Sequence, residues 1–104
     1  GDVSNGTGEH LSSGSGRFQI AFNGEIYNYL DLAKKYLQHL RPGDAGLTDT
    51  EVLVNLHDVM AFDSVPDEID GMYAYALFDL KANKLILNRD PQGEKTLYIN
   101  FCIV

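Results

Sequence analysis

The sequence has one cysteine, few basic residues and no long apolar run, and each shortage excludes a class of protein. Because Cys102 is the single cysteine, the chain has no intramolecular disulfide and no multi-cysteine metal site, and we expect a cytoplasmic location. Eight Lys and Arg against 15 Asp and Glu give a net charge of −7. That balance argues against nucleic acid and against an anionic membrane surface, since both attract clustered cations. No apolar stretch approaches the roughly 20 residues of a membrane-spanning helix.

The sequence also argues against a metal site and against more than one domain. The three histidines, His10, His39 and His57, lie in separate segments without the spacing of metal ligands. We expect no metal and no cofactor, and we predict that His39 and His57 lie at or near the surface. Residues 1–16 are rich in Gly and Ser, which predicts a flexible arm. The 104 residues suit one domain, which we place at residues 17–104.

The first half of that domain predicts one strand and two helices. Residues 17–22 alternate apolar and polar side chains, as in a strand, and Asn23-Gly24 is predicted to break it. Apolar spacing of three and four residues predicts a helix over 29–40, with Asn28 as its N-cap. Thr48-Asp49-Thr50-Glu51 is a capping box and predicts the start of a second helix.

The second half predicts three strands after an acidic loop at residues 63–70. The run 72–78 is apolar on both faces, which indicates a central strand that needs cover on both sides. Residues 85–89 and 96–103 predict two further strands, separated by turns. The fold class is therefore α+β, with mainly antiparallel sheets and two helices.

Asn23-Gly24 has two interpretations. The pair favours a hairpin turn, but a helix rather than a partner strand follows it. Alternatively, the Asn23 side-chain amide and the Gly24 backbone N–H are two donors that can converge on an oxyanion.

Three other residues also have two interpretations each. Asp49 is either a first-turn carboxylate that complements the helix dipole or the anchor of a ligand ammonium group. Glu25 is either a loop residue bonded to the backbone or a support for Asn23. Cys102 lies in an apolar run, where a cysteine is more often a small hydrophobic residue than a nucleophile. Arg89-Asp90, followed by Gly93 and Lys95, resembles a charged turn with a salt bridge.

Four segments together resemble the class II glutamine amidotransferase domain of asparagine synthetases. They occur in the family's order and at its spacing, and they are RFQIAFNGEIYNY (17–29), TDTEVL (48–53), GMYAYALFD (71–79) and RDPQGEKTLY (89–98). The resemblance implies the N-terminal-nucleophile hydrolase fold, in which two antiparallel sheets are stacked between helices. It also implies that Asn23 and Gly24 form an oxyanion hole, that Asp49 holds the α-ammonium group of glutamine, and that Glu25 lines the site.

The sequence departs from the family at the residues that perform the chemistry. The family's nucleophile is a cysteine at the start of the mature chain, whereas this chain begins Gly1-Asp2-Val3. The family's arginine for the substrate carboxylate lies upstream of the Asn-Gly pair, and no arginine precedes Arg17. Two smaller differences are Pro91, where the family usually has Arg, and Thr96, where it usually has Pro. We therefore expect an incomplete αββα sandwich with no catalytic residue of its own and no enzymatic activity on its own.

Two functions follow as hypotheses. The first is a non-catalytic, truncated amidotransferase-like domain that binds glutamine or a related amino acid weakly, or that acts in assembly. The second is the glutaminase fragment of a glutamine-hydrolysing asparagine synthetase, with its cysteine on a missing segment or another chain. Since sheet edges and apolar faces would be exposed, we predict a homodimer or higher homo-oligomer, or a complementing N-terminal chain.

Overall fold

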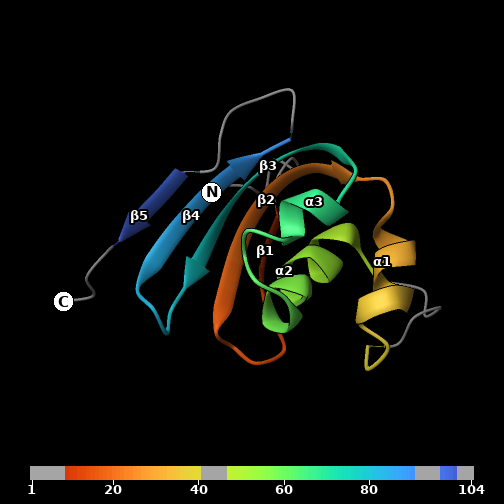
Figure 1. Cartoon of the computed structure of the whole chain (residues 1–104), viewed down its shortest axis with the longest axis horizontal. Coiled ribbons are helices and arrows are strands. Elements are labelled where there is room, and N and C mark those ends of the chain that lie inside the picture. The colour runs from red at the N-terminus through yellow and green to blue at the C-terminus, as the bar shows by residue number, and fades with distance from the viewer. Residues whose placement is uncertain (1–8, 41–46, 91–96, 101–104) are drawn as a thin grey trace.

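The part of the chain that the structure describes forms one antiparallel sheet with helices on one face (Figure 1). The computed structural model describes residues 9–40, 47–90 and 97–100. The elements are β1 (Glu9–Ser12), β2 (Phe18–Ile26), α1 (Tyr29–Tyr36), α2 (Asp49–Val59), α3 (Val65–Glu68), β3 (Gly71–Asp79), β4 (Lys84–Arg89) and β5 (Leu97–Asn100). The α+β class with an antiparallel sheet is confirmed.

The strand order across the sheet is the same as the order along the chain, β1-β2-β3-β4-β5, and each neighbouring pair is antiparallel. The helices lie over the β1, β2 and β3 side, and α2 separates the sheet from α1 (Figure 1). The described residues thus contain one sheet and one helical layer of the sandwich that the resemblance implies. No helix in this part of the chain is both long and apolar enough to cross a membrane.

Strand β2 does not end at Asn23-Gly24 as predicted, but continues to Ile26. Gly24 stays in the ladder, opposite Tyr73, with a φ of +127°. A Cβ atom on Gly24 would lie 2.2 Å from the carbonyl oxygen of Met72. The pair is therefore not a turn: glycine allows a left-handed backbone and a close approach of β3 at the same residue.

Strand β1 lies within residues 1–16, for which we predicted a flexible arm. Its residues pair with β2, for example Leu11 with Ile20, so the prediction that structure begins at Arg17 is wrong for residues 9–16. The turn after β1 is fixed to α2, because the Gly14 N–H donates to Asn55 Oδ1 at 2.9 Å and the Ser15 hydroxyl to Asp58 Oδ1 at 2.7 Å. Residues 1–8 lie outside the described residues.

The helices follow the predictions at their starts better than at their ends. Thr48 Oγ1 accepts a hydrogen bond from the Glu51 N–H at 3.1 Å, which confirms the N-cap of α2. Helix α1 starts at Tyr29 as predicted but ends at Tyr36, and a tighter turn closes with the Leu40 N–H donating to the Leu37 carbonyl. The predicted loop 63–70 contains the short helix α3, which has Pro66 in its first turn, where proline is favoured.

Strand β3 is the middle strand, as expected from its apolar composition, but helices cover only one of its faces. Tyr73, Tyr75 and Leu77 are buried beneath them, whereas Met72 is 66% exposed and Ala74 is also exposed. Within the described residues of this single chain, one face of the strand is thus covered, and cover of the other face by a second copy remains a prediction. The predicted strand 96–103 is seen as β5 over 97–100, and Cys102 lies outside the described residues.

Candidate functional site

The predicted site residues lie near the point where the end of β2 approaches the start of α2. Asn23, Gly24 and Glu25 lie in the second half of β2, and Asp49 is the first residue of α2. Asp49 Oδ2 accepts a hydrogen bond from the backbone N–H of Ile26 at 2.9 Å. This bond places the Asp49 carboxylate two residues along the strand from Gly24.

Backbone hydrogen bonds establish which way the Gly24 N–H points. The Tyr27 N–H donates to the Asp70 carbonyl, and the Leu80 N–H donates to the Arg17 carbonyl. Odd-numbered residues of β2 therefore share hydrogen bonds with β3, and in an antiparallel ladder the even-numbered residues face the opposite side. The Ser13 N–H bond to the Phe18 carbonyl, on the β1 side, agrees with this.

Gly24 and Ile26 consequently direct their N–H groups to the β1 side of β2. Described pairing with β1 reaches only Phe22, which lies opposite Glu9, so it stops short of Gly24. The Ile26 N–H is bonded to Asp49. The Gly24 N–H and the Asp49 carboxylate thus share one strand edge, about 7 Å apart along the strand.

Among the described residues, only one of the two Asp49 oxygens accepts a hydrogen bond. Its Oδ2 is used by Ile26, and none of the described residues donates to Oδ1. The side chain is half-buried at the N-terminus of α2, where the helix dipole favours a negative charge. A carboxylate that is oriented by one oxygen and open at the other can accept a cationic donor such as an ammonium group.

Asn23 and Glu25 point to the other face of the sheet from the buried Phe22 and Ile26, and both are exposed. Asn23 pairs with Ala74 and Glu25 with Met72. The interpretation of Glu25 as a loop residue is therefore wrong, because it is part of the ladder. No hydrogen bond among the described residues joins the Asn23 or Glu25 side chain to Asp49.

Asn28 is predicted from the sequence only as the N-cap of a helix. It occupies the N-cap position of α1 but its side chain makes no cap hydrogen bond. Instead, Nδ2 donates to the Glu68 carbonyl and Oδ1 accepts from the Asp70 N–H, each at 2.9 Å. Asn28 therefore joins the segment after β2 to the segment before β3, a link that local sequence does not reveal.

Asp90 forms hydrogen bonds to backbone groups of β3, while Gly93 and Lys95 of the predicted charged turn lie outside the described residues. The Tyr73 N–H donates to Asp90 Oδ1 at 3.3 Å, and the Asp90 N–H donates to the Tyr73 carbonyl at 3.0 Å. Tyr73 lies opposite Gly24. Its backbone groups are thus engaged away from β2, which agrees with the direction assigned to the Gly24 N–H.

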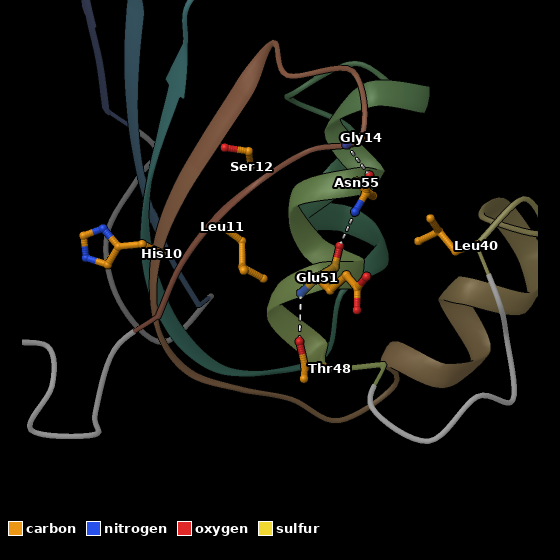
Figure 2. A pocket seen from close by; sticks show the side chains of 8 residues that line it. All are labelled: His10, Leu11, Ser12, Gly14, Leu40, Thr48, Glu51 and Asn55. Carbon is orange, nitrogen blue, oxygen red and sulfur yellow. Dashed lines mark hydrogen bonds between the residues drawn. The ribbon is translucent and has the colours of Figure 1, made fainter.

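A pocket of about 600 Å³ lies beside this region, between β1 and α2 (Figure 2). It is lined by His10, Leu11, Ser12, Gly14, Leu40, Thr48, Glu51 and Asn55. None of the predicted site residues lines it, although Thr48 and Glu51 flank Asp49 in sequence. The side chains of Thr48 and Asn55 bond to neighbouring backbone groups rather than to one another (Figure 2).

A buried polar cluster lies between α2 and the sheet. His57 is 4% exposed, so its prediction as a surface or boundary residue is wrong. The Tyr75 hydroxyl lies 3.4 Å from His57 Nε2 and accepts from Asn88 Nδ2 at 3.2 Å. Burial lowers the pKa of His57 to about 4, although the nearby Asp58 carboxylate acts to raise it. His57 is neutral at pH 7.

An ion pair lies at the opposite end of β2. The Arg17 guanidinium donates two hydrogen bonds to Asp79, at 2.8 Å and 2.7 Å. The Arg17 bonds, helped by the backbone N–H groups of Ala82 and Lys81, lower the pKa of Asp79, and the Asp79 bond raises the pKa of Arg17. This pair stabilises the β2–β3 pairing far from Gly24.

Comparison with known proteins places these features in a family. The profile described as "Glutamine amidotransferase domain" matches residues 2–102. The chain is 42% identical over 79 residues to "Putative asparagine synthetase [glutamine-hydrolyzing] 2" of Methanocaldococcus jannaschii, which covers 76% of this chain and 14% of the relative. It is 33% identical over 93 residues to "Asparagine synthetase [glutamine-hydrolyzing] 1" of Saccharomyces cerevisiae, covering 86% and 15%. A Bacillus subtilis relative, "Asparagine synthetase [glutamine-hydrolyzing] 2", is 35% identical over 97 residues, covering 93% and 12%. The chain thus spans about one seventh of these relatives.

Proposed function

Since this chain belongs to the glutamine amidotransferase domain family and is of the asparagine synthetase type, we propose that it binds glutamine at the edge of β2 as part of a glutaminase site. The observation that carries the proposal is the 2.9 Å hydrogen bond from the Ile26 N–H to Asp49 Oδ2. It brings a carboxylate from α2 to the strand edge that also presents the Gly24 N–H.

In this proposal Asp49 Oδ1 receives the α-ammonium group of glutamine. An ammonium–carboxylate hydrogen bond is charge-assisted and stronger than a neutral one. Because Oδ2 is already bonded to Ile26, the carboxylate is oriented before the ligand arrives. Glu25, exposed beside Gly24, lines the same site.

Asn23 and Gly24 act at the other end of the ligand, the side-chain amide. Attack on that amide gives a tetrahedral intermediate whose oxygen carries negative charge, and N–H donors fixed in advance stabilise it. The Gly24 N–H, held at the strand edge, and the exposed Asn23 amide on the neighbouring residue are the donors we assign to it.

Hydrolysis also needs a nucleophile. The chain has one cysteine, Cys102, and we assign the nucleophile instead to an N-terminal cysteine of a segment or chain that combines with this one. A reducing cytoplasmic location suits this thiol chemistry. The runner-up function is a non-catalytic module that binds an amino acid or assembles with copies of itself. The exposed Met72 and Ala74 on the sheet face opposite the helices favour it.

Calorimetric titration with glutamine tests the binding step. Asp49→Asn keeps an oxygen for the Ile26 N–H but removes the charge, so affinity should fall about tenfold or more, as for loss of a charged hydrogen bond. Glu51→Gln is the matched control, because it removes one charge from the same helical turn but leaves the hydrogen bond from the Ile26 N–H to Asp49 in place. Absence of binding at millimolar glutamine, or equal loss in both variants, refutes the proposal.

Adding an N-terminal segment that begins with cysteine separates the two functions. Release of ammonia from glutamine by the combined protein supports the glutaminase, provided Asn23→Ala lowers the rate about a hundredfold, as for loss of one oxyanion donor. Binding of glutamine without release of ammonia supports the non-catalytic module.

A further inference from the structure

The end of β2 that carries the proposed site is held by hydrogen bonds to two other parts of the chain, the start of α2 and the segment just before β3. The Ile26 N–H donates to Asp49 of α2, and the Tyr27 N–H donates to the Asp70 carbonyl at 2.7 Å. Asn28 follows with its two side-chain bonds to Glu68 and Asp70. Three consecutive residues are thus fixed, immediately after Gly24 and Glu25.

Asn28 differs from the other two because its side chain connects separate segments. It bonds to the backbone on both sides of Ile69, just before β3 begins at Gly71. Tyr36 of α1 adds to this junction, since its hydroxyl donates to the Glu68 carboxylate at 2.9 Å. The junction therefore fixes the register in which β2 pairs with β3.

That register matters at Gly24 and Gly71. A Cβ on Gly71 would lie 2.1 Å from the Glu25 carbonyl oxygen, and one on Gly24 would lie 2.2 Å from the Met72 carbonyl oxygen. The two backbones approach closely on both sides of Glu25. Gly24 also holds a φ of +127°, a conformation that glycine adopts readily and other residues rarely do.

We infer that Asn28 is a positioning residue, which holds the Gly24 N–H and the Asp49 carboxylate in register by joining the end of β2 to the start of β3. It touches neither the proposed ligand nor the reacting atoms. The inference about geometry stands on the hydrogen bonds alone, and its consequence for glutamine rests on the proposed function.

Asn55 provides a matched control. It also makes two hydrogen bonds to backbone, accepting from the Gly14 N–H at 2.9 Å and donating to the Glu51 carbonyl at 2.8 Å. It is 5% exposed and lies away from Gly24, between α2 and the turn after β1. Asn55→Ala should destabilise the fold at least as much as Asn28→Ala, without affecting the β2–β3 junction.

The primary readout is amide hydrogen exchange by NMR, with the Ile26 rate divided by that of Val54 in the core of α2. Asn28→Ala should raise this ratio about tenfold, as for loss of roughly one net hydrogen bond, and Asn55→Ala should leave it unchanged. Asn28→Asp, which keeps an acceptor for the Asp70 N–H, should give an intermediate ratio and is the variant to use if the alanine variant does not fold. An unchanged ratio in the Asn28 variants, or an equal rise in Asn55→Ala, overturns the inference.

Glutamine titration of the same variants tests the consequence for the site. Asn28→Ala should weaken binding about fivefold or more, and Asn55→Ala should not. If the wild-type chain binds no glutamine, the proposed function fails while the exchange ratio still decides the role of Asn28. If the ratio rises but glutamine affinity is unchanged, the positioning of the ligand site is refuted.

Discussion

Replacing Gly24 by alanine tests the backbone geometry on which the site depends. The new Cβ would lie 2.2 Å from the Met72 carbonyl oxygen and 2.6 Å from Tyr73 Cα. Both are backbone atoms, so neither moves away as a flexible side chain would. The residue would also keep a φ of +127°, which an L side chain rarely adopts.

Two other glycines separate these contributions. Gly16 has a φ of +81° with no atom within 4 Å of its Cβ position, so Gly16→Ala measures backbone strain alone, about 1 kcal/mol. Gly71 has no positive φ but its Cβ would lie 2.1 Å from the Glu25 carbonyl oxygen. Gly71→Ala therefore measures overpacking alone, about 2 kcal/mol.

Gly24→Ala combines both effects, so its free energy of unfolding should fall by about 3 kcal/mol, the sum of the other two. At roughly 4–8 °C per kcal/mol for a domain of this size, the melting temperature should fall by about 12–24 °C. Urea unfolding followed by far-UV circular dichroism gives all three values. A loss for Gly24→Ala no larger than for Gly16→Ala would show that β3 does not approach Gly24 as described.

Two further predictions concern the buried polar residues His57 and Asp79. Because the pKa of His57 falls from 6.5 to about 4 on folding, the unfolded chain binds the proton more tightly, and stability is lost as pH falls from 6.5 towards 4. The loss is about 3 kcal/mol from a shift of 6.5 − 4 = 2.5; urea titrations at pH 7 and 4.5 should show it, and an equally steep loss in His57→Phe would contradict the assignment. Asp79→Ala should cost about 3 kcal/mol, because a buried carboxylate that accepts from Arg17, Lys81 and Ala82 is lost. Arg17→Ala should cost less, about 1–2 kcal/mol, because Arg17 is 42% exposed and screened by water; thermal melts would contradict this ranking if the order were reversed. The pKa of Asp79 is lowered in the fold, so its contribution is present above its unfolded pKa of 3.8 and disappears only at lower pH.

The elements specified by local sequence were predicted well. The capping box gave the start of α2, and the apolar spacing from Tyr29 gave the start of α1. Both signals involve residues within one or two turns of each other. The apolar run at residues 72–78 likewise identified the middle strand of the sheet, which spans Gly71–Asp79.

Features that depend on distant residues were missed. Asn23-Gly24 stays in a strand because Tyr73 and Ala74 lie opposite it, and β1 forms because β2 offers its free edge. His57 is buried because α2 lies between the sheet and α1. For this histidine a signal did exist, since it follows the buried Leu53 by four residues on one helical face.

The candidate site was predicted in part. Asp49 was identified from its place in the capping box and from the resemblance, and the structure joins it to the end of β2. Asn28 was assigned to a cap because Asn favours that position. Its bonds to Glu68 and Asp70 span 40 and 42 positions of sequence, so no local pattern encodes them.

The strand order has a consequence for how the molecule folds. Among the described strands, β1 with β2, β3 with β4 and β4 with β5 are neighbours in sequence, whereas β2 with β3 must close the chain over residues 27–70. Closing a long loop is entropically costly and slows folding. Because Gly24 and Asn28 depend on this pairing, we expect the β2 edge to form later than the pairings between strands that are adjacent in sequence.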